Sequence, residues 1–196
     1  MSSRDDILSA VRQHLPQAMP LPELQGPWIQ YPDRIAQFAS VLDMIGGKCV
    51  RVPSLEAINN ELAALPQYSS ARQIVSTIPG VGSQTVSLDA IDDPHQLEDV
   101  DFAILPGQFG VAENAAVWVS SDGLKHRVIY FLCQHLSLVI SASDVLNNMS
   151  EAYERLSFAN NSFGAFIAGP SKTADIEQSL VIGAHGPRSM TIFIVG

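Results

Sequence analysis

Apolar residues follow two different spacings along this chain. In some stretches they recur every three or four residues, which is typical of a helix with one buried face, and in others they form short runs bounded by Gly, Pro, Asn or Asp, which is typical of strands. The helical spacing predicts helices over 4–15, 33–45, 54–65 and 144–158, the last capped by Ser143 or Asp144. The short runs predict strands over 48–52, 72–78, 101–105, 116–119, 136–140, 163–168 and 190–195.

Alternation of strands with helices predicts an α/β fold, a mainly parallel sheet with flanking helices. One antiparallel exception is expected, because Asp122-Gly123 is a strong turn signal between the apolar runs 116–119 and 128–132. The organisation predicted is an N-terminal helix and Pro-rich arm over 1–32, followed by a single domain over 33–196.

The C-terminal run 169–188 holds the densest group of chemically useful residues. Gly169-Pro170 ends the strand 163–168, and Ser171 or Thr173 is expected to cap a short helix whose apolar stripe contains Ile176 and Leu180. The first N–H groups of a helix lie at the positive end of its dipole, so this loop, helped by Lys172, is a candidate binding site for a carboxylate or phosphate. It is not a Walker A loop, because Ser171 stands where that motif needs a second Gly.

The same run places further charged residues around the expected helix. Asp175 and Glu177 lie off its apolar stripe, Gly183 is a plausible stop, and His185 and Arg188 fall on the turn before the last strand. The plainer interpretation is that the carboxylates complement the helix dipole and that His185 is structural. The clustering favours a ligand site, since ligands of open α/β sheets commonly bind at the carboxyl ends of the strands.

Three stretches of the chain are similar to one known family. The string GPSKTADIEQSLVIGAHGPRSMTIFIV, residues 169–195, resembles the closing pattern GPSxTADIExxLVxGxHGPxxLxVxLV of the lactate utilization protein C family, the LUD domain. Residues 110–115 resemble its AETG segment, and Gln134-His135-Leu136 resembles its PVHIAVV segment. Asn114 and Ala115 replace the usual Thr and Gly, although the Asn114 amide can still hydrogen-bond a ligand.

The resemblance implies the fold shared by ribose-5-phosphate isomerase, glucosamine-6-phosphate deaminase and CoA transferases. It also implies a subunit without clusters, placed beside two iron–sulfur partner proteins in a system that oxidises L-lactate to pyruvate. If the last strand lies within the sheet, Glu113, Thr173, Asp175 and His185 are expected to converge near one end. The candidate catalytic residues are Glu113, Asp175 and His185. The candidate ligand-binding residues are Asn114, His135, Gly169, Ser171, Lys172, Thr173, Glu177, Gly186 and Arg188.

Composition narrows the class of partner. The 196 residues are 46% hydrophobic and carry a net charge of −9, which fits one globular domain and argues against nucleic acid, since a backbone binder needs a basic surface. The polar N-terminus resembles no signal peptide, and no segment reaches eighteen apolar residues, so we expect a cytoplasmic protein with no membrane association.

Cofactor chemistry is also limited by the sequence. Cys49 and Cys133 lie far apart, so cysteines alone form neither a zinc site nor an iron–sulfur cluster. The loop 79–86 has Thr85 where a dinucleotide fingerprint needs its third Gly. The acidic residues and His185 include a single imidazole at uninformative spacing, so no metal is assigned. We therefore expect no cofactor in this chain, with iron–sulfur clusters on partner subunits.

Three functional hypotheses follow from these observations. The first is the cluster-free subunit of a lactate-oxidising system, which binds a small anionic metabolite. The second is a freestanding enzyme on a sugar phosphate, CoA ester or folate-like compound, with Glu113 as base or nucleophile and with Lys172 and Arg188 orienting the anion. The third is a metabolite sensor or assembly scaffold without catalytic activity.

Overall fold

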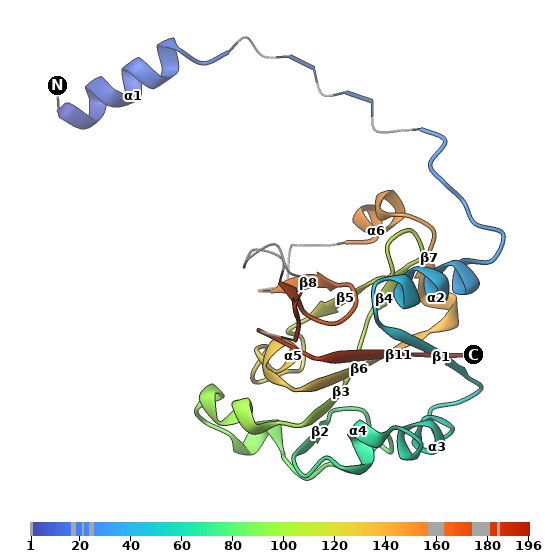
Figure 1. The fold of residues 1–196 in the computed structure, drawn as a ribbon. Helices are drawn as coiled ribbons and strands as arrows, with labels where there is room; N and C mark the ends of the chain where they lie inside the picture. Colours follow the sequence, from blue (N-terminus) through green and yellow to red (C-terminus); the bar gives the residue numbers. More distant parts are fainter. Residues whose placement is uncertain are drawn as a thin grey trace.

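The computed structural model describes residues 2–16, 19–20, 22–23, 26–156, 163–173, 181–183 and 185–196. Its centre is a sheet of five parallel strands in the order β1-β11-β6-β3-β2, with the last strand of the chain next to the middle of the sheet (Figure 1). The strands are β1 (Lys48–Val52), β2 (Ile74–Ser76), β3 (Phe102–Pro106), β6 (His135–Ser141) and β11 (Ser189–Val195). The predicted α/β class with a mainly parallel sheet is confirmed.

A second sheet of four strands packs on one side of the first. Its order is β7-β4-β5-β8, with β4 antiparallel to β5 and β5 antiparallel to β8. The strands are β4 (Phe109–Val111), β5 (Ala116–Ser120), β7 (Val145–Leu146) and β8 (Gly164–Ile167). A short antiparallel pair, β9 (Lys172–Thr173) and β10 (Val181–Ile182), completes the described strands.

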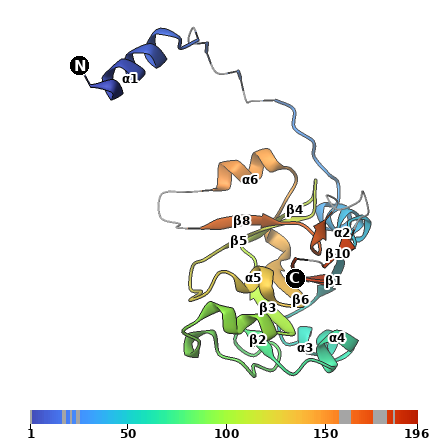
Figure 2. The same ribbon diagram turned by 60° about the vertical axis from the view of Figure 1, so that its left-hand side comes forward.

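The helices are short, and most lie against the two sheets (Figure 2). They are α1 (Ser3–Gln13), α2 (Arg34–Met44), α3 (Ile58–Ala63), α4 (Pro66–Ser69), α5 (Ile129–Leu132) and α6 (Met149–Arg155), with 3-10 turns at Leu88–Ala90, Pro94–Asp99 and Ala142–Asp144. Helix α2 begins where the sequence predicts, because the Asp33 carboxylate accepts hydrogen bonds from the N–H groups of Ile35 and Ala36.

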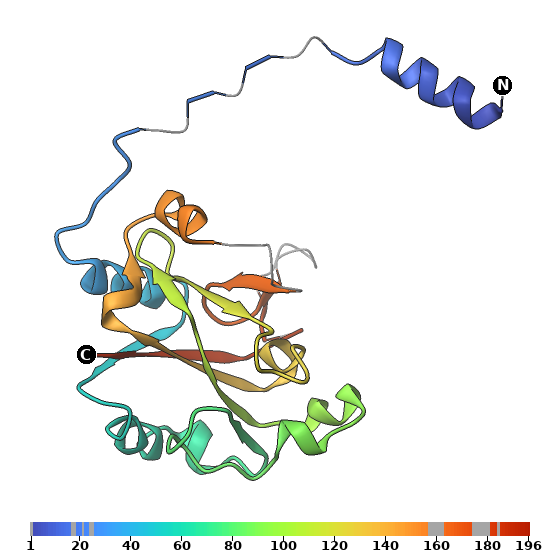
Figure 3. The same ribbon diagram turned by 180° about the vertical axis from the view of Figure 1, so that it is seen from behind.

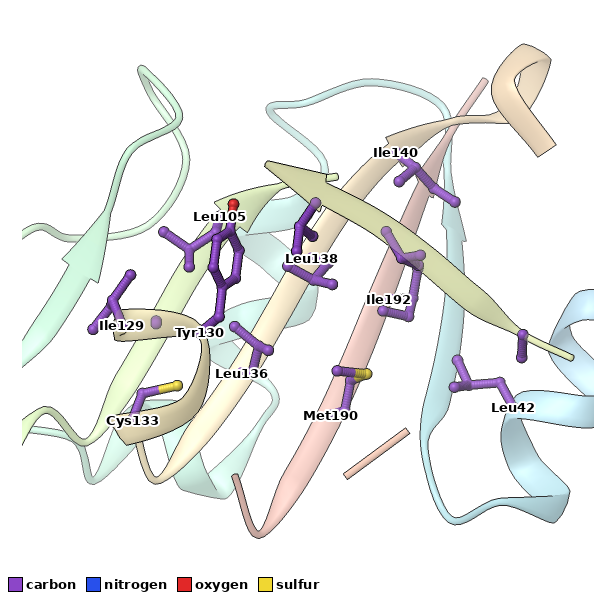
Figure 4. Close-up of a cluster of buried hydrophobic side chains, with 14 of the residues drawn as sticks. Leu42, Leu105, Ile129, Tyr130, Cys133, Leu136, Leu138, Ile140, Met190 and Ile192 are labelled. Atoms are coloured by element: carbon purple, nitrogen blue, oxygen red, sulfur yellow. The ribbon is translucent and has the colours of Figure 1, made fainter. Parts of the chain in front are cut away.

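The main core lies between the two sheets. Side chains that point to one face of β6 and β11, such as Leu136, Leu138 and Ile192, pack against α2, α5 and the four-stranded sheet (Figure 4). Alternate residues of a strand point to opposite faces, so the other face of the same strands carries His135, Ser137 and Ser189. A smaller apolar cluster, which includes Ile58, Leu62 and Phe193, packs α3 onto that face.

One predicted element near the second sheet differs from the structure. The run 128–132 was expected to pair with 116–119, but it contains α5, and β5 pairs instead with β4 and β8. A short apolar run does not by itself distinguish a buried strand from a buried helical turn. The antiparallel part of the protein is therefore a separate sheet and not a local exception within the parallel one.

Two predicted helix starts also differ. Ser143 and Asp144 belong to a 3-10 turn, and the helix that follows is α6, capped by the Asn148 side chain, which accepts from Glu151 N–H. Ser171 does not cap a helix, because Lys172 and Thr173 form β9. Val181 and Ile182, which directly precede the expected helix stop at Gly183, form β10. The stretch 174–180 between them lies outside the described residues.

The N-terminal helix stands apart from the two sheets. Helix α1 has no buried residue, and Figures 1 and 3 show it at the end of an extended arm. The arm joins the sheets at 29–31, where Asn148 Nδ2 donates to Ile29 O and Tyr31 N–H donates to the Asn147 side chain. The predicted division between arm and domain at 32/33 remains a prediction.

Candidate functional site

Polar residues meet at the edge of the parallel sheet where its strands begin. Asp101 directly precedes β3, Gln134 precedes β6 and Arg188 precedes β11. Backbone hydrogen bonds hold these positions in line, because Asp101 O accepts from His135 N–H at 3.0 Å and Gln134 O accepts from Arg188 N–H at 2.8 Å. The amino ends of adjacent parallel strands therefore bring these residues together.

His135 is the titratable group at the centre of this edge. Its Nδ1 lies 2.8 Å from the Ser189 hydroxyl, and no hydrogen bond joins its Nε2 to another described residue. Burial lowers the pKa of His135, the nearby Arg188 charge lowers it further, and Asp101 opposes the shift. The imidazole is thus held neutral. In the tautomer whose Nδ1–H donates to Ser189, Nε2 is an acceptor, and in the other tautomer Nε2 carries the proton and donates.

Asp101 supplies a fixed negative charge beside the imidazole. Its Oδ2 accepts from the N–H groups of Arg72 at 2.8 Å and Gln73 at 2.9 Å. The hydrogen bond from Gln73 is the main reason that the pKa of Asp101 is lowered, and Arg72 and His135 also contribute. The carboxylate is therefore ionised and pinned to the loop before β2.

These groups line a hollow of about 330 Å³, which we call the amino-edge pocket. Its walls are Gln67, Ser70, Ala71, Asp101, Gln134, His135 and Arg188. Arg188 is exposed, and two backbone donors occupy the Asp101 Oδ2 atom, so the pocket offers a guanidinium, a neutral imidazole and amide groups beside the ionised Asp101 carboxylate. That set of groups suits a small carboxylate, which a guanidinium can bind with two parallel hydrogen bonds.

The loop motif 169–173 supports the segment that carries Arg188. Ser171 N–H donates to Pro187 O at 2.9 Å, and Ser171 O accepts from Gly183 N–H at 2.9 Å. Gly183 has φ of 75°, and a Cβ there would lie 2.5 Å from Arg188 Cγ, so only glycine allows this close approach. The motif thus positions the Arg188 segment through backbone contacts.

The sequence-predicted site residues separate into groups. His135 and Arg188 line the amino-edge pocket, while exposed His185 and half-buried Gly186 lie on the neighbouring turn. Gly169 is buried against Ile45. Ser171 and Thr173 are half-buried, and Lys172 is exposed on β9. Asp175 and Glu177 lie outside the described residues.

Glu113 and Asn114 lie on the turn between β4 and β5, next to the start of α6. The Glu113 Oε2 atom accepts from Met149 N–H at 2.9 Å, and Asn114 Oδ1 accepts from Ala116 N–H at 3.1 Å. Within the described part of the chain, no hydrogen bond or ion pair joins Glu113 to Thr173 or His185. Convergence of Glu113 with the C-terminal motif remains a prediction.

Sequence reasoning missed Asp101, Gln134, Ser189, Gln67 and Ser70. A usable signal was present for the first three, because polar residues stand at or just before the starts of three strands. Parallel pairing of those strands brings their first residues to one edge. Gln67 and Ser70 come from α4 and its end, and no pattern in the sequence ties that helix to the edge.

The described residues contain no group of three or more His, Cys, Asp or Glu side chains arranged to hold a metal ion. Burial raises the pKa of the Cys49 thiol to about 11 and that of the Cys133 thiol to about 12, so both are protonated at neutral pH. None of the helices in the described ranges is both long enough and apolar enough to span a membrane.

Comparison with known proteins matches most of the chain to one family. The family model described as LUD domain matches residues 37–195. Lactate utilization protein C 1 of Bacillus mycoides is 31% identical over 117 residues, covering 55% of this chain and 48% of the relative. Lactate utilization protein C of Halalkalibacterium halodurans is 33% identical over 100 residues, covering 46% and 42%. The chain thus spans about half the length of the curated relatives that it matches.

One solved structure has the same overall fold. The crystal structure of a DUF162 family protein from Deinococcus radiodurans superposes with a TM-score of 0.66 at 15% sequence identity. The match covers 83% of this chain and 96% of that protein. At this identity the similarity concerns the fold alone.

Proposed function

Because this chain belongs to the LUD domain family, we propose that it is a component of a lactate utilization system and that it binds a small carboxylate in the amino-edge pocket. The relatives named lactate utilization protein C support the proposed role in lactate utilization. The pocket supports the ligand class, since a guanidinium and a neutral imidazole both line it.

The placement of His135 and Arg188 in one pocket is the observation that carries the proposal, and the lowered pKa of His135 supports it. Arg188 would bind the carboxylate of lactate or pyruvate, since its planar fork matches two carboxylate oxygens. In the tautomer whose Nδ1–H donates to Ser189, His135 Nε2 would accept a hydrogen bond from the hydroxyl of the 2-hydroxy acid. A neutral ring is needed for that acceptor role, and burial keeps the ring neutral.

Electron transfer in the proposed system would fall to other proteins. A conventional iron–sulfur cluster takes four Cys thiolates, and this chain has two Cys residues. Clusters would therefore reside on iron–sulfur partner proteins, and this chain would contribute substrate binding. Detection of lactate turnover by the purified chain alone, with an added electron acceptor, would contradict this division of roles.

Calorimetric titration of the full chain with L-lactate and with pyruvate tests the binding step. We expect saturable binding that weakens at least tenfold in Arg188→Gln, because a charge-assisted carboxylate contact contributes about 1.5–3 kcal/mol. Arg12→Gln is the matched control, since Arg12 lies exposed on α1, and it should bind as the wild type does. Absence of binding to the wild type, or equal binding by Arg188→Gln, would contradict the proposal.

Affinity purification under reducing, anaerobic conditions tests the assembly step. The tagged chain should recover cysteine-rich proteins whose absorbance shows iron–sulfur clusters. Recovery of the chain alone, from cells growing on lactate, would count against a role as a subunit of such a system.

A further inference from the structure

A second hollow adjoins the amino-edge pocket. It measures about 400 Å³, and we call it the outer hollow. The two hollows share Gln134 and Arg188, so they meet at the Arg188 side chain. The rest of the outer hollow differs in chemistry from the amino-edge pocket. Phe131 and Leu132 are its apolar lining residues, and Glu98 and His185 are polar lining residues.

The Phe131 ring is the unusual feature of this hollow. It is 40% exposed, although large aromatic rings of a domain are mostly buried. It meets the Phe163 ring edge-on at 6.5 Å between centroids, and the Arg127 guanidinium lies 5.0 Å from the Phe163 centroid. An exposed aromatic surface next to cationic side chains is the kind of surface on which flat, electron-rich rings stack.

The size of the outer hollow exceeds what the proposed carboxylate needs. Pockets for drug-sized ligands measure about 300–1,000 Å³, whereas lactate has three carbons and is held through its carboxylate and hydroxyl. The amino-edge pocket alone offers about 330 Å³ for it. The outer hollow is therefore left for another ligand or another part of a ligand.

We propose that the outer hollow binds a planar aromatic ring that carries an amino group and is linked to an anionic group, as in an adenine mononucleotide. The ring would stack on Phe131, and the anion would contact Arg188 and lie near His185. Glu98 is the lining group that repels an anion, so it would face the ring and accept a hydrogen bond from the amino group. This inference goes beyond the carboxylate site, and it does not require lactate to bind.

The backbone around the hollow is held in place before any ligand arrives. Ser171 bonds both Pro187 and Gly183, and a Cβ at Gly186 would lie 3.0 Å from Ser171 Cβ. The segment that presents His185 and Arg188 is thus packed against the loop 169–173. A preorganised wall lowers the ordering cost of binding.

Calorimetric titration of the full chain with AMP, adenosine and ribose 5-phosphate separates the contributions of ring and anion. We expect AMP to bind more tightly than either fragment. Phe131→Leu should weaken AMP about tenfold and leave ribose 5-phosphate unchanged, because stacking of a base on an aromatic ring accounts for that order of affinity. Phe131→Tyr keeps the ring and should retain AMP binding, which guards against a loss caused by misfolding.

Tyr153→Leu is the matched control, because Tyr153 is an aromatic residue that is 60% exposed on α6, away from both hollows. It should bind AMP as the wild type does. Equal affinity for AMP and ribose 5-phosphate, or AMP binding that Phe131→Leu leaves unchanged, would overturn the inference. Binding of AMP without any binding of lactate would uphold it while contradicting the proposed function.

Discussion

Two histidines of this chain have pKa values shifted in opposite directions by their surroundings. Burial and Arg188 lower the pKa of His135, whereas the hydrogen bond to the Asp93 carboxylate raises that of exposed His95. NMR titration should therefore give a midpoint below 6.5, the ordinary value, for His135 and above it for His95. Arg188→Gln should move the His135 midpoint upward and leave His95 unchanged. A His135 midpoint above 6.5 would contradict the neutral imidazole on which the proposed carboxylate contact depends.

The lowered pKa of His135 also determines how the stability of the protein changes with pH. Since the folded-state pKa of His135 is below the unfolded value, the unfolded chain binds more protons as the pH falls. The contribution of His135 to stability is complete above about pH 6.5 and is lost as the pH falls through the folded-state pKa. This loss should be absent from the pH dependence of unfolding in His135→Gln.

Ser137 and Ser76 make a second contrast between residues of one type. Among the described residues, the Ser137 hydroxyl is the buried side-chain group without a hydrogen-bond partner, whereas the Ser76 hydroxyl donates to Val81 O at 2.6 Å. Ser137→Ala should raise the free energy of unfolding by about 1 kcal/mol, and Ser76→Ala should lower it by a similar amount. Urea unfolding measures both. A destabilised Ser137→Ala would show that this hydroxyl has a partner in solution.

At the scale of elements, the Glu113 carboxylate tethers the start of α6. It accepts from Met149 N–H, the first residue of the helix. Loss of such a contact at a helix start costs about 1 kcal/mol, so Glu113→Ala should lower the free energy of urea unfolding by that amount. Glu154→Ala, an exposed change in the same helix, is the control and should have less effect. An unchanged stability in Glu113→Ala would leave this carboxylate available for another role.

Strands were predicted better than the connections between them. The five strands of the parallel sheet follow apolar runs that the sequence marks clearly, and 48–52 matches β1 throughout. The residues that follow these runs predicted the connecting segments less well. Ser171 is a good helix cap in isolation, yet its backbone bonds Pro187 and Gly183, which lie far along the chain, and it leads into β9. Tertiary contacts of this kind override local preference.

At the scale of the whole molecule, the topology decides which polar residues meet. Arg188 and His135 are distant in sequence, and they share a pocket because β11 lies next to β6. Local patterns predict where the strands lie in the sequence, but not which strands are neighbours in the sheet. The sequence could therefore predict His135 and Arg188 as candidates, but not that Asp101 and Gln134 lie beside them. The carboxyl-end rule, which was applied to the run 169–188, does not fit Arg188, since that residue directly precedes its strand.

The N-terminal arm and helix α1 should contribute little to the stability of the whole chain. Helix α1 buries no residue, and the described hydrogen bonds between the arm and the sheets begin at Ile29. Removal of residues 1–26 should therefore leave the free energy of unfolding within about 0.5 kcal/mol of the full chain, with the same denaturant dependence, because little buried surface is lost. Urea unfolding at several protein concentrations measures this. A loss above about 1 kcal/mol would mean that the exposed apolar stripe of Ile7 and Val11 packs in solution. If the stability of the full chain also rises with its concentration, that packing is against another copy of the chain.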